Sequence, residues 1–420
     1  MLHAQVSRLP RKHLLRMIKI EHLLHPLRAA RYARTMSVEH YRMRRAVSRA
    51  QATHENDGRY RLQNVTDAFV SHLDDTDAGA DAVLLERICA AYIKATEQSE
   101  GDRGQYGATP WWRNIQRNGL SAVRQALATR DIDKLHAMYR NFFRDPCGTG
   151  LVPRPPGRAA SYFNNRISDT QRRFILGESL HRIDYWRTQT GGRFPLSCLR
   201  GSGVGNPFGV LLDGTLVAAG AEFQHCCADR ILSLCTADFP KRNPADGPDL
   251  TVAEIGGGFG GMAYYLLRGN PAVTYLDFDV PESLALTAYY LSKSLPQAAM
   301  LLYGEAEFTE GCANRYDVIL MPPWELGKLS ANSVDITFSS HALSDLVPAA
   351  RAEYMREIAR ATRGWLLTVG AKGACDSLHA FIRAAHPSLA RVVSRRLEWN
   401  SYRAPQVEEV EHLFRVHERK

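Results

Sequence analysis

The segment Glu254-Ile-Gly-Gly-Gly-Phe-Gly-Gly261 constrains the fold of this chain more than any other feature. It follows the short apolar run from Thr251 to Ile255 and precedes an apolar run with helical spacing. Glycine lets the backbone turn tightly and approach a ligand without a Cβ in the way. A strand, a glycine-rich turn and a helix in this order predict a nucleotide-binding site. The turn glycines that we expect at that site are Gly256, Gly257, Gly258 and Gly260.

The glycine spacing alone leaves two ligands open, because Gly256-x-Gly258-x-x-Gly261 also fits the dinucleotide pattern of NAD-binding proteins. Glu254 favours S-adenosyl-L-methionine (SAM), since a carboxylate there suits an ammonium and a sulfonium and repels a pyrophosphate. Asp279, about twenty residues after the turn, is placed to accept hydrogen bonds from ribose hydroxyls. Glu305 is expected as a further acceptor near the adenine. We therefore expect SAM as the cofactor.

The chain from Leu250 onward alternates β-type runs with helical ones, which predicts a mostly parallel sheet covered by helices. The fold class is therefore α/β. Tyr316 to Met321 is a further apolar run, either an extra strand or part of an insertion. The strands that we expect are 251–255, 273–279, 299–303, 334–338 and 365–369.

The sequence suggests three parts along the chain. Residues 1–58 form a basic helical arm, and residues 59–249 form a mainly helical region that serves as a substrate cover, a lid or an oligomerisation surface. Within that region, Asp213-Gly214 between two apolar runs predicts a β-hairpin. Residues 250–420 form the SAM-binding domain. Homo-oligomers are compatible with this organisation.

Basic residues are concentrated at the N-terminus. Residues 1–50 contain twelve of the 53 lysines and arginines but two of the 44 acidic residues. The catalytic part is close to neutral, so we expect no nucleic-acid partner. The arm is open to two interpretations: a peripheral contact with an anionic membrane or glycan, or a solvated helix packed on the body.

The remaining composition narrows the class of protein. No apolar run is long enough to span a bilayer, so we expect a cytoplasmic protein, with peripheral membrane contact through the arm as the alternative. The eight cysteines lack metal-ligand spacing, and we expect free thiols in a reducing compartment and no metal site.

Three segments together resemble a known family. Glu254 to Leu266, Asp277 to Glu282 and Tyr289 to Lys293 closely resemble the sugar O-methyltransferases that include the nanchangmycin-type enzyme, and the resemblance extends over about residues 85–370. It implies a Rossmann-like class I SAM-dependent methyltransferase domain. It also implies a sugar-containing acceptor, either a glycosylated natural product or a surface polysaccharide. The chain has Ser339 and Ala342 where the family has Asn and Ser, and we expect Ser339 beside the cofactor.

The catalytic candidates follow the fourth expected strand. A sugar hydroxyl becomes a good nucleophile when a general base removes its proton. His341 is expected at the carboxyl edge of the sheet as that base, with Asp345 orienting it or binding a sugar hydroxyl. The alternatives are a structural histidine that caps the next helix and an aspartate that merely begins it. At the level of the whole protein, an NAD(P)-dependent oxidoreductase and a non-catalytic SAM-fold binding protein stay open.

Overall fold

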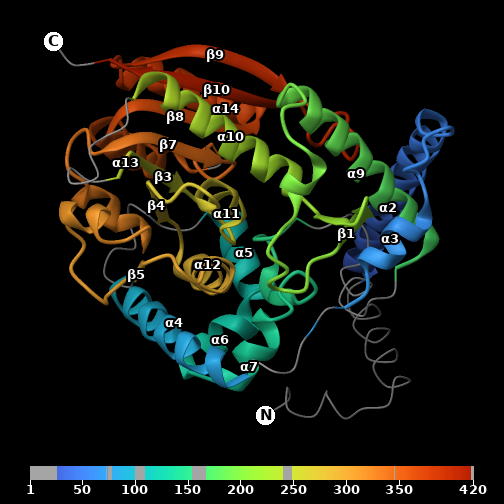
Figure 1. Cartoon of the computed structure of the whole chain (residues 1–420), viewed down its shortest axis with the longest axis horizontal. Helices are drawn as coiled ribbons and strands as arrows, with labels where there is room; N and C mark the ends of the chain where they lie inside the picture. The colour runs from blue at the N-terminus through green and yellow to red at the C-terminus, as the bar shows by residue number, and fades with distance from the viewer. Residues whose placement is uncertain are drawn as a thin grey trace.

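The computed structural model describes residues 26–71, 73, 78–99, 109–153, 167–239, 248–344 and 346–417, with residues 26–39, 78–80 and 99 described by their backbone alone. An eight-stranded sheet lies at the centre, with helices on both of its faces and a further group of helices beside it (Figure 1).

The strand order of the sheet is β5-β6-β4-β3-β7-β8-β10-β9. Every neighbouring pair is parallel except those of β10, which runs antiparallel to both β8 and β9. This is a Rossmann-like sheet with one reversed strand near an edge, and it confirms the α/β class. The strands are β3 (Leu250–Ile255), β4 (Val273–Phe278), β5 (Met300–Leu302), β6 (Val318–Met321), β7 (Val334–Ser340), β8 (Thr362–Ala371), β9 (Leu389–Leu397) and β10 (Glu409–Val416).

The register of the central strands places the glycine turn beside Asp279. Leu250 pairs with Val273 and Ile255 pairs with Phe278, so β3 and β4 end level with each other. The residues that follow each strand therefore emerge at the same edge of the sheet, as expected for parallel strands.

The five expected strands are confirmed, and the further apolar run is the strand β6. Its position is informative, because β6 lies between β4 and β5 and leaves β5 at the edge of the sheet. The last two strands were not predicted from the sequence. β9 is a half-exposed edge strand that carries three arginines, and β10 buries the polar side chains of Glu409, Glu411 and His412. Neither pattern has the apolar periodicity of a typical strand.

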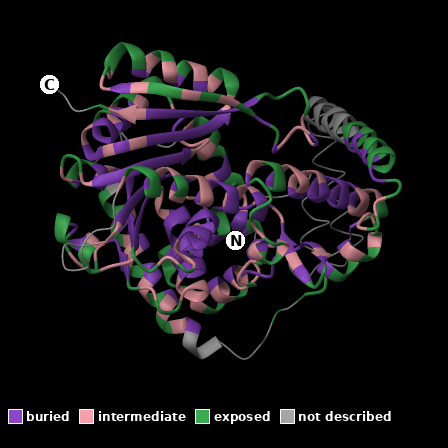
Figure 2. Ribbon diagram, turned by 45° about the horizontal axis from the view of Figure 1, so that its top comes forward, coloured by how far each residue is buried: buried purple, intermediate pink, exposed green. Residues whose placement is uncertain are grey.

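Helices cover both faces of the sheet. One face packs against α10 (Ala221–Asp238), α11 (Gly261–Leu267) and α12 (Pro281–Ser294), and the other against α13 (Pro348–Ala361) and α14 (Lys372–Ala385). Figure 2 shows the strands and the helices against them largely buried.

The helical region adds α4 (Ala78–Ser99), α5 (Pro110–Asn118), α6 (Ser121–Thr129), α7 (Ile132–Tyr139) and α9 (Asp169–Gln189). One hydrophobic core joins this region to the sheet, since Leu85, Tyr139 and Trp186 belong to the same buried cluster as Val252 and Tyr275. The expected boundary at 249/250 therefore falls within a continuous core. The helical region is positioned firmly enough to contribute to a site on the sheet.

The expected hairpin is confirmed as β1 (Gly209–Leu212) and β2 (Thr215–Ala218). Asp213 and Gly214 both have positive φ, 48° and 69°, which is the two-residue turn that matches the twist of the strands.

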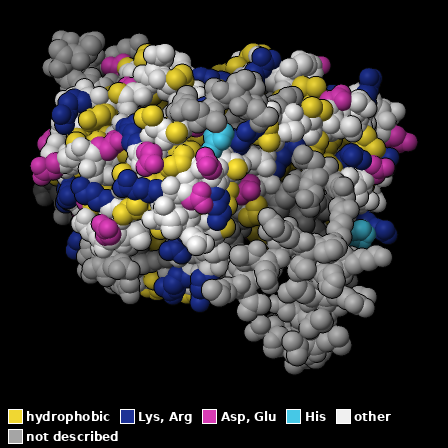
Figure 3. Space-filling view, turned by 90° about the horizontal axis from the view of Figure 1, so that it is seen from below, with side chains coloured by type: hydrophobic (Ala, Val, Ile, Leu, Met, Phe, Trp, Pro, Cys, Tyr) yellow, Lys and Arg dark blue, Asp and Glu magenta, His cyan; other side chains and the backbone are white. Residues whose placement is uncertain are grey.

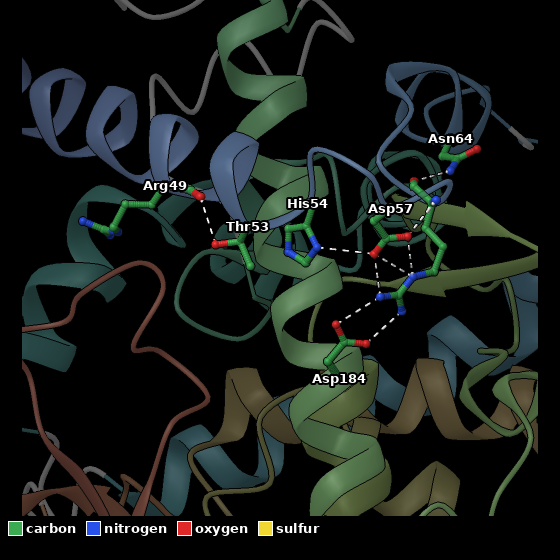
Figure 4. Close-up of polar contacts among 7 residues, drawn as sticks. Arg49, Thr53, His54, Asp57, Asn64 and Asp184 are labelled. Atoms are coloured by element: carbon green, nitrogen blue, oxygen red, sulfur yellow. Dashed lines mark hydrogen bonds and ion pairs between the residues drawn. The ribbon is translucent and has the colours of Figure 1, made fainter.

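Beside the hairpin, α2 (Pro26–Thr53) and α3 (Leu62–Ala68) pack on α9. Arg59 joins the segment between them to α9, because its guanidinium bonds both Asp57 and Asp184 (Figure 4). His54 of the same segment contacts Asp57 at 3.3 Å. The Arg59 hydrogen bond outweighs burial and holds the pKa of Asp57 well below its usual range.

The part of the basic arm that the structure describes packs on the body. Met43, Val47 and Ala50 of α2 are buried against α9, while the basic side chains Arg42 and Arg45 are exposed. Residues 1–25 lie outside the described residues, so contact with an anionic surface stays a prediction. On the face shown in Figure 3, basic and acidic side chains are intermingled. Within the described part of the chain, the helices are too short or too polar to cross a membrane.

Candidate functional site

A pocket of about 240 Å³ lies at the carboxyl edge of the parallel strands. Its floor comes from the residues that follow β3, β4, β6 and β7, and its cover comes from α5 and the segment after α7. The lining residues are Thr109, Trp111, Trp112, Gly150, Leu151, Ile255, Gly256, Gly258, Phe278, Asp279, Val280, Pro323, Ser340, His341, Ala342, Leu346 and Tyr354.

The strand order makes this pocket elongated. Neighbouring strands lie about 4.8 Å apart, so the three steps from β6 to β7 span roughly 14 Å. Asp279 and Pro323 stand toward the β6 side, and His341 stands at the β7 side. A ligand that fills this pocket would therefore meet Pro323 and His341 at opposite ends, with Asp279 between them.

The glycine turn needs its glycines for two distinct reasons. Gly256 has φ of 81°, and a Cβ there would lie 2.3 Å from the Cβ of Ala342. Gly258 has φ of 68°, and its Cβ would lie 3.3 Å from the carbonyl oxygen of Leu151. The turn is therefore tightly held between β7 and the cover of the pocket.

The turn's N–H groups are already bonded within the protein. Gly257 N donates to Asp277 Oδ1 at 3.0 Å, and Gly258 N donates to Asp279 Oδ2 at 3.1 Å. Gly256 N and Gly260 N donate to the backbone oxygens of Phe278 and Gly257, each at 3.1 Å. A dinucleotide pyrophosphate is held by such turn N–H groups. Two of them here bond carboxylates instead.

Three carboxyl groups gather around the turn. Burial raises the pKa of Glu254 to about 8, although Tyr275 donates to its Oε2 at 2.6 Å. Burial, together with the charges of Asp279 and Glu254, raises the pKa of Asp277 well above its ordinary value, and its Oδ2 has no hydrogen-bond partner among the described residues. The surroundings of the turn are therefore suited to a cationic ligand and opposed to an anionic one.

Asp279 lines the pocket, as expected for a ribose ligand, but much of its bonding capacity is used. Burial raises its pKa to about 6 against the hydrogen bonds that it accepts. Oδ2 accepts from Gly258 N and from Ser283 Oγ at 2.5 Å, and Oδ1 accepts from Val280 N at 2.7 Å. Each carboxylate oxygen has about two acceptor positions. One acceptor position therefore remains on Oδ1, which leaves room for a hydrogen bond from one ribose hydroxyl.

His341 lies in the pocket with a left-handed backbone, φ 64°, and its side chain is 45% exposed. Its Nε2 lies 3.1 Å from Oε1 of Glu409, the first residue of β10. Asn400 Nδ2 donates to the same oxygen at 2.7 Å. Burial acts to raise the pKa of Glu409, but the bond and charge of His341, the Asn400 amide and the Arg182 charge leave it below its ordinary value.

Glu409 and Asn400 were missed by the sequence analysis. The reversed direction of β10 brings its first residue to the edge where the parallel strands end, opposite Ala371 at the end of β8. No local motif marks either residue, so a signal could come only from predicting β10 and its direction.

Glu254, Gly257 and Gly260 are not among the residues that line the pocket. Three further expected site residues differ from their predicted roles or lie outside the described residues. The Ser339 hydroxyl is buried, bonding Ile255 O and Leu343 N, each at 3.0 Å, so it braces the β3 and β7 ends instead of facing the pocket. Glu305 is not among the lining residues, because β6 separates β5 from β4. Its carboxylate bonds Arg87 of α4. Asp345 lies outside the described residues.

The cover of the pocket carries two tryptophans. Trp112 Nε1 donates to Glu282 at 2.8 Å, and Gln116 Nε2 donates to the same oxygen at 2.6 Å, which joins α5 to the first turn of α12. Trp111 is 64% exposed and also lines the pocket. Trp111 therefore does not serve to pack the hydrophobic core. In the described part of the chain, acidic, histidine and cysteine side chains form no group of three or more suited to a metal ion.

No protein-family model matches this chain, and a search of curated proteins finds no match. Solved structures do match. A SAM-dependent methyltransferase from Aquifex aeolicus is 15% identical, covers 45% of this chain and 89% of its own, and has a TM-score of 0.30. The N-methyltransferase NodS from Bradyrhizobium japonicum, solved with S-adenosyl-L-homocysteine, is 14% identical over 46% and 86%, with a TM-score of 0.29. The [4+2]-cyclase SpnF is 12% identical over 58% and 96%, with a TM-score of 0.33. At these values the likenesses carry no argument about activity, which depends on the site.

Proposed function

We propose that this chain is a SAM-dependent O-methyltransferase. The observation that carries the proposal is the bonding of the glycine turn. Carboxylates accept from Gly257 N and Gly258 N, and Glu254 adds a third carboxyl group beside them. A pyrophosphate would have to displace these hydrogen-bonded carboxyl groups and would oppose their ionisation, whereas a ligand with an ammonium and a sulfonium would favour their ionised form. This geometry disfavours the NAD(P)-dependent oxidoreductase.

The residues of the pocket fit SAM. Asp279 would hold a ribose hydroxyl through Oδ1, and Val280 and Pro323 offer apolar surface for the adenine. Gly256 and Gly258 line the pocket, and the methionine part would lie against them. When bound, SAM supplies an electrophilic methyl group on a sulfonium sulfur.

His341 is the candidate base on the acceptor side. The imidazole accepts the proton of an acceptor hydroxyl at Nδ1, because Nε2 is committed to Glu409. Glu409 then stabilises the imidazolium that forms, as the carboxylate does in other histidine–carboxylate pairs. Glu409 is a second candidate for the orienting role predicted for Asp345, which lies outside the described residues.

A sugar hydroxyl is the acceptor that we favour. The family resemblance of residues 254–293 supports it, and so does Trp111 at the wall of the pocket, whose exposed ring offers a flat apolar face to the C–H side of a pyranose.

Incubation with SAM that carries a deuterated methyl group tests this proposal. A panel of glycosides and polysaccharide fragments would be analysed by mass spectrometry. The proposal predicts a labelled methyl ether on a sugar oxygen, with His341→Ala as the inactive control. Label on nitrogen or on a non-sugar oxygen would reject the sugar acceptor, and SAM binding without transfer to any acceptor class would favour the non-catalytic alternative.

A further inference from the structure

The first half of the loop between β9 and β10 packs on α9. His181 Nε2 lies 3.0 Å from the carbonyl oxygen of Glu398 and 2.9 Å from Ser401 Oγ. Arg403 donates to both carboxylate oxygens of Glu178, at 2.8 and 2.7 Å. We name residues 398–403 the docking loop. Its backbone and its outward side chains are thus fixed to a helix of the N-terminal region.

Tyr402 of the docking loop fits against a glycine of α9. A Cβ at Gly177 would lie 2.4 Å from Tyr402 Oη and 2.6 Å from the Cβ of Ala50 in α2. The ring of Phe174 stands 5.2 Å from that of Tyr402. Arg49 Nη2 donates to the carbonyl oxygen of Tyr402 at 3.3 Å. Two helices therefore hold this one residue of the loop.

Asn400 points from the docking loop toward the catalytic candidates. It donates to Oε1 of Glu409, the oxygen that also contacts Nε2 of His341. Glu409 is 4% exposed, and its second oxygen, Oε2, has no hydrogen-bond partner among the described residues. A buried carboxylate with one bonded and one unbonded oxygen can rotate unless a donor fixes it. Beside His341 itself, Asn400 is the donor that bonds this carboxylate.

We propose that Asn400 is a positioning residue, which holds Glu409 Oε1 against His341, and that docking of residues 398–403 on α9 sets its position. The inference rests on the proposed function for its kinetic consequence. The alignment of Glu409 with His341 is inferred only from the contacts of Glu409 with Asn400 and His341. Through the docking of residues 398–403, the helical region influences the position of Glu409 and His341. The helix α9 itself does not line the pocket.

The first test replaces the side-chain amide of Asn400 and measures the pKa of His341. Hydrogen–deuterium exchange at the imidazole C2, measured by mass spectrometry at a series of pH values, gives the pKa of His341 without any substrate. Glu409→Gln should lower that pKa, because the imidazolium loses its carboxylate, and Asn400→Ala should lower it by a smaller amount. The isosteric Asn400→Asp should raise it, because a second carboxylate is added beside the ring. An unchanged pKa in folded Asn400→Ala and Asn400→Asp proteins would overturn the inference.

The second test acts from a distance. Gly177→Ala forces a Cβ toward Tyr402, whereas Gly373→Ala in α14 meets nothing within 4 Å and is the matched control. We expect Gly177→Ala to lower the pKa of His341 as Asn400→Ala does, and Gly373→Ala to leave it unchanged. If Gly177→Ala does not fold, Arg403→Gln loosens the same loop. A wild-type pKa in whichever loop variant folds would reject the role of docking.

Kinetics complete the test. Loss of a hydrogen bond to a charged group corresponds to about a 10- to 100-fold effect, so kcat of Asn400→Ala should fall by that factor while the Kd for SAM stays at the wild-type value. A loss of SAM affinity instead would show general disruption and count against positioning. If the wild-type protein transfers no methyl group, the proposed function fails, but the C2 exchange result still decides the contact between Asn400, Glu409 and His341.

Discussion

The cofactor half and the acceptor half of the pocket are built in different ways. The cofactor half comes mainly from one continuous stretch, residues 254–283, in which the glycine turn, Asp277 and Asp279 bond one another, with Pro323 added at the adenine end. The acceptor half brings together α5, the end of β7 and the start of β10, and a loop that docks on α9. Substitutions in the first half should therefore change SAM binding, and those in the second should change turnover.

His341→Ala gives the largest expected effect and tests the separation of the two halves. General-base assistance is worth about 10² to 10⁴ in rate, so turnover should fall by that factor, with the Kd for SAM unchanged. Wild-type activity should also fall as the pH drops through the histidine's titration, because an imidazolium cannot accept a proton. Steady-state kinetics and calorimetry measure the two quantities. Near-normal turnover would show that this histidine is structural.

Asp279→Ala is the matching change in the cofactor half. The variant loses a hydrogen bond to the ribose and weakens the turn, so SAM affinity should fall by about 1.5 to 3 kcal/mol. Ser283→Ala is the control, because it removes a bond that supports the same carboxylate but has no contact with the pocket. A smaller loss is expected there. An equal loss in both variants would mean that Asp279 acts through the turn and not through the ligand.

The pH dependence of SAM binding probes the carboxyl groups at the turn. The pKa of Glu254 in the folded protein, about 8, lies above its unfolded value, so its contribution to stability is present below about pH 4.5 and is lost as the pH rises toward 8. A cationic ligand favours the ionised form, so the increase in Tm on adding SAM should grow between about pH 6 and 8. Glu254→Gln should flatten this increase. A thermal shift independent of pH in the wild type would separate these carboxyl groups from the ligand.

Trp111→Ala should have the smallest effect of these substitutions. It should change the binding of the acceptor and leave the binding of SAM unchanged. The stacking face is lost, so the KM for the sugar should rise by a few fold, a change of about 0.5 to 1.5 kcal/mol. Trp111→Phe should keep part of the contact. A change in the Kd for SAM instead, measured by titration, would move Trp111 to the adenine end of the pocket.

The same contrast explains what the sequence could predict. The glycine turn and Asp279 are local, and their strand–turn–helix context is visible in residues 250–283, so their placement was predictable. Glu305 shows the limit, because its expected place depended on β5 lying next to β4. The strand β6, which the sequence indicates only as a further apolar run, takes that position.

The acceptor half depends on pairings between distant segments. Glu409 reaches His341 because β10 inserts in reverse between β8 and β9, and its polar side chains hide this strand from a search for apolar periodicity. Gly177 gives a second example. Nothing in the sequence of α9 indicates that a glycine is needed there, and the reason appears only when Tyr402 and Ala50 lie against it.

Calorimetric titration of the unmodified protein with SAM and with NAD tests the central claim most directly. Because carboxylates already accept from Gly257 N and Gly258 N, we predict that SAM binds with a Kd within the range of about 1 μM to 1 mM usual for enzyme substrates, and that NAD gives no binding heat. Binding of NAD in preference to SAM would contradict this account of the glycine turn.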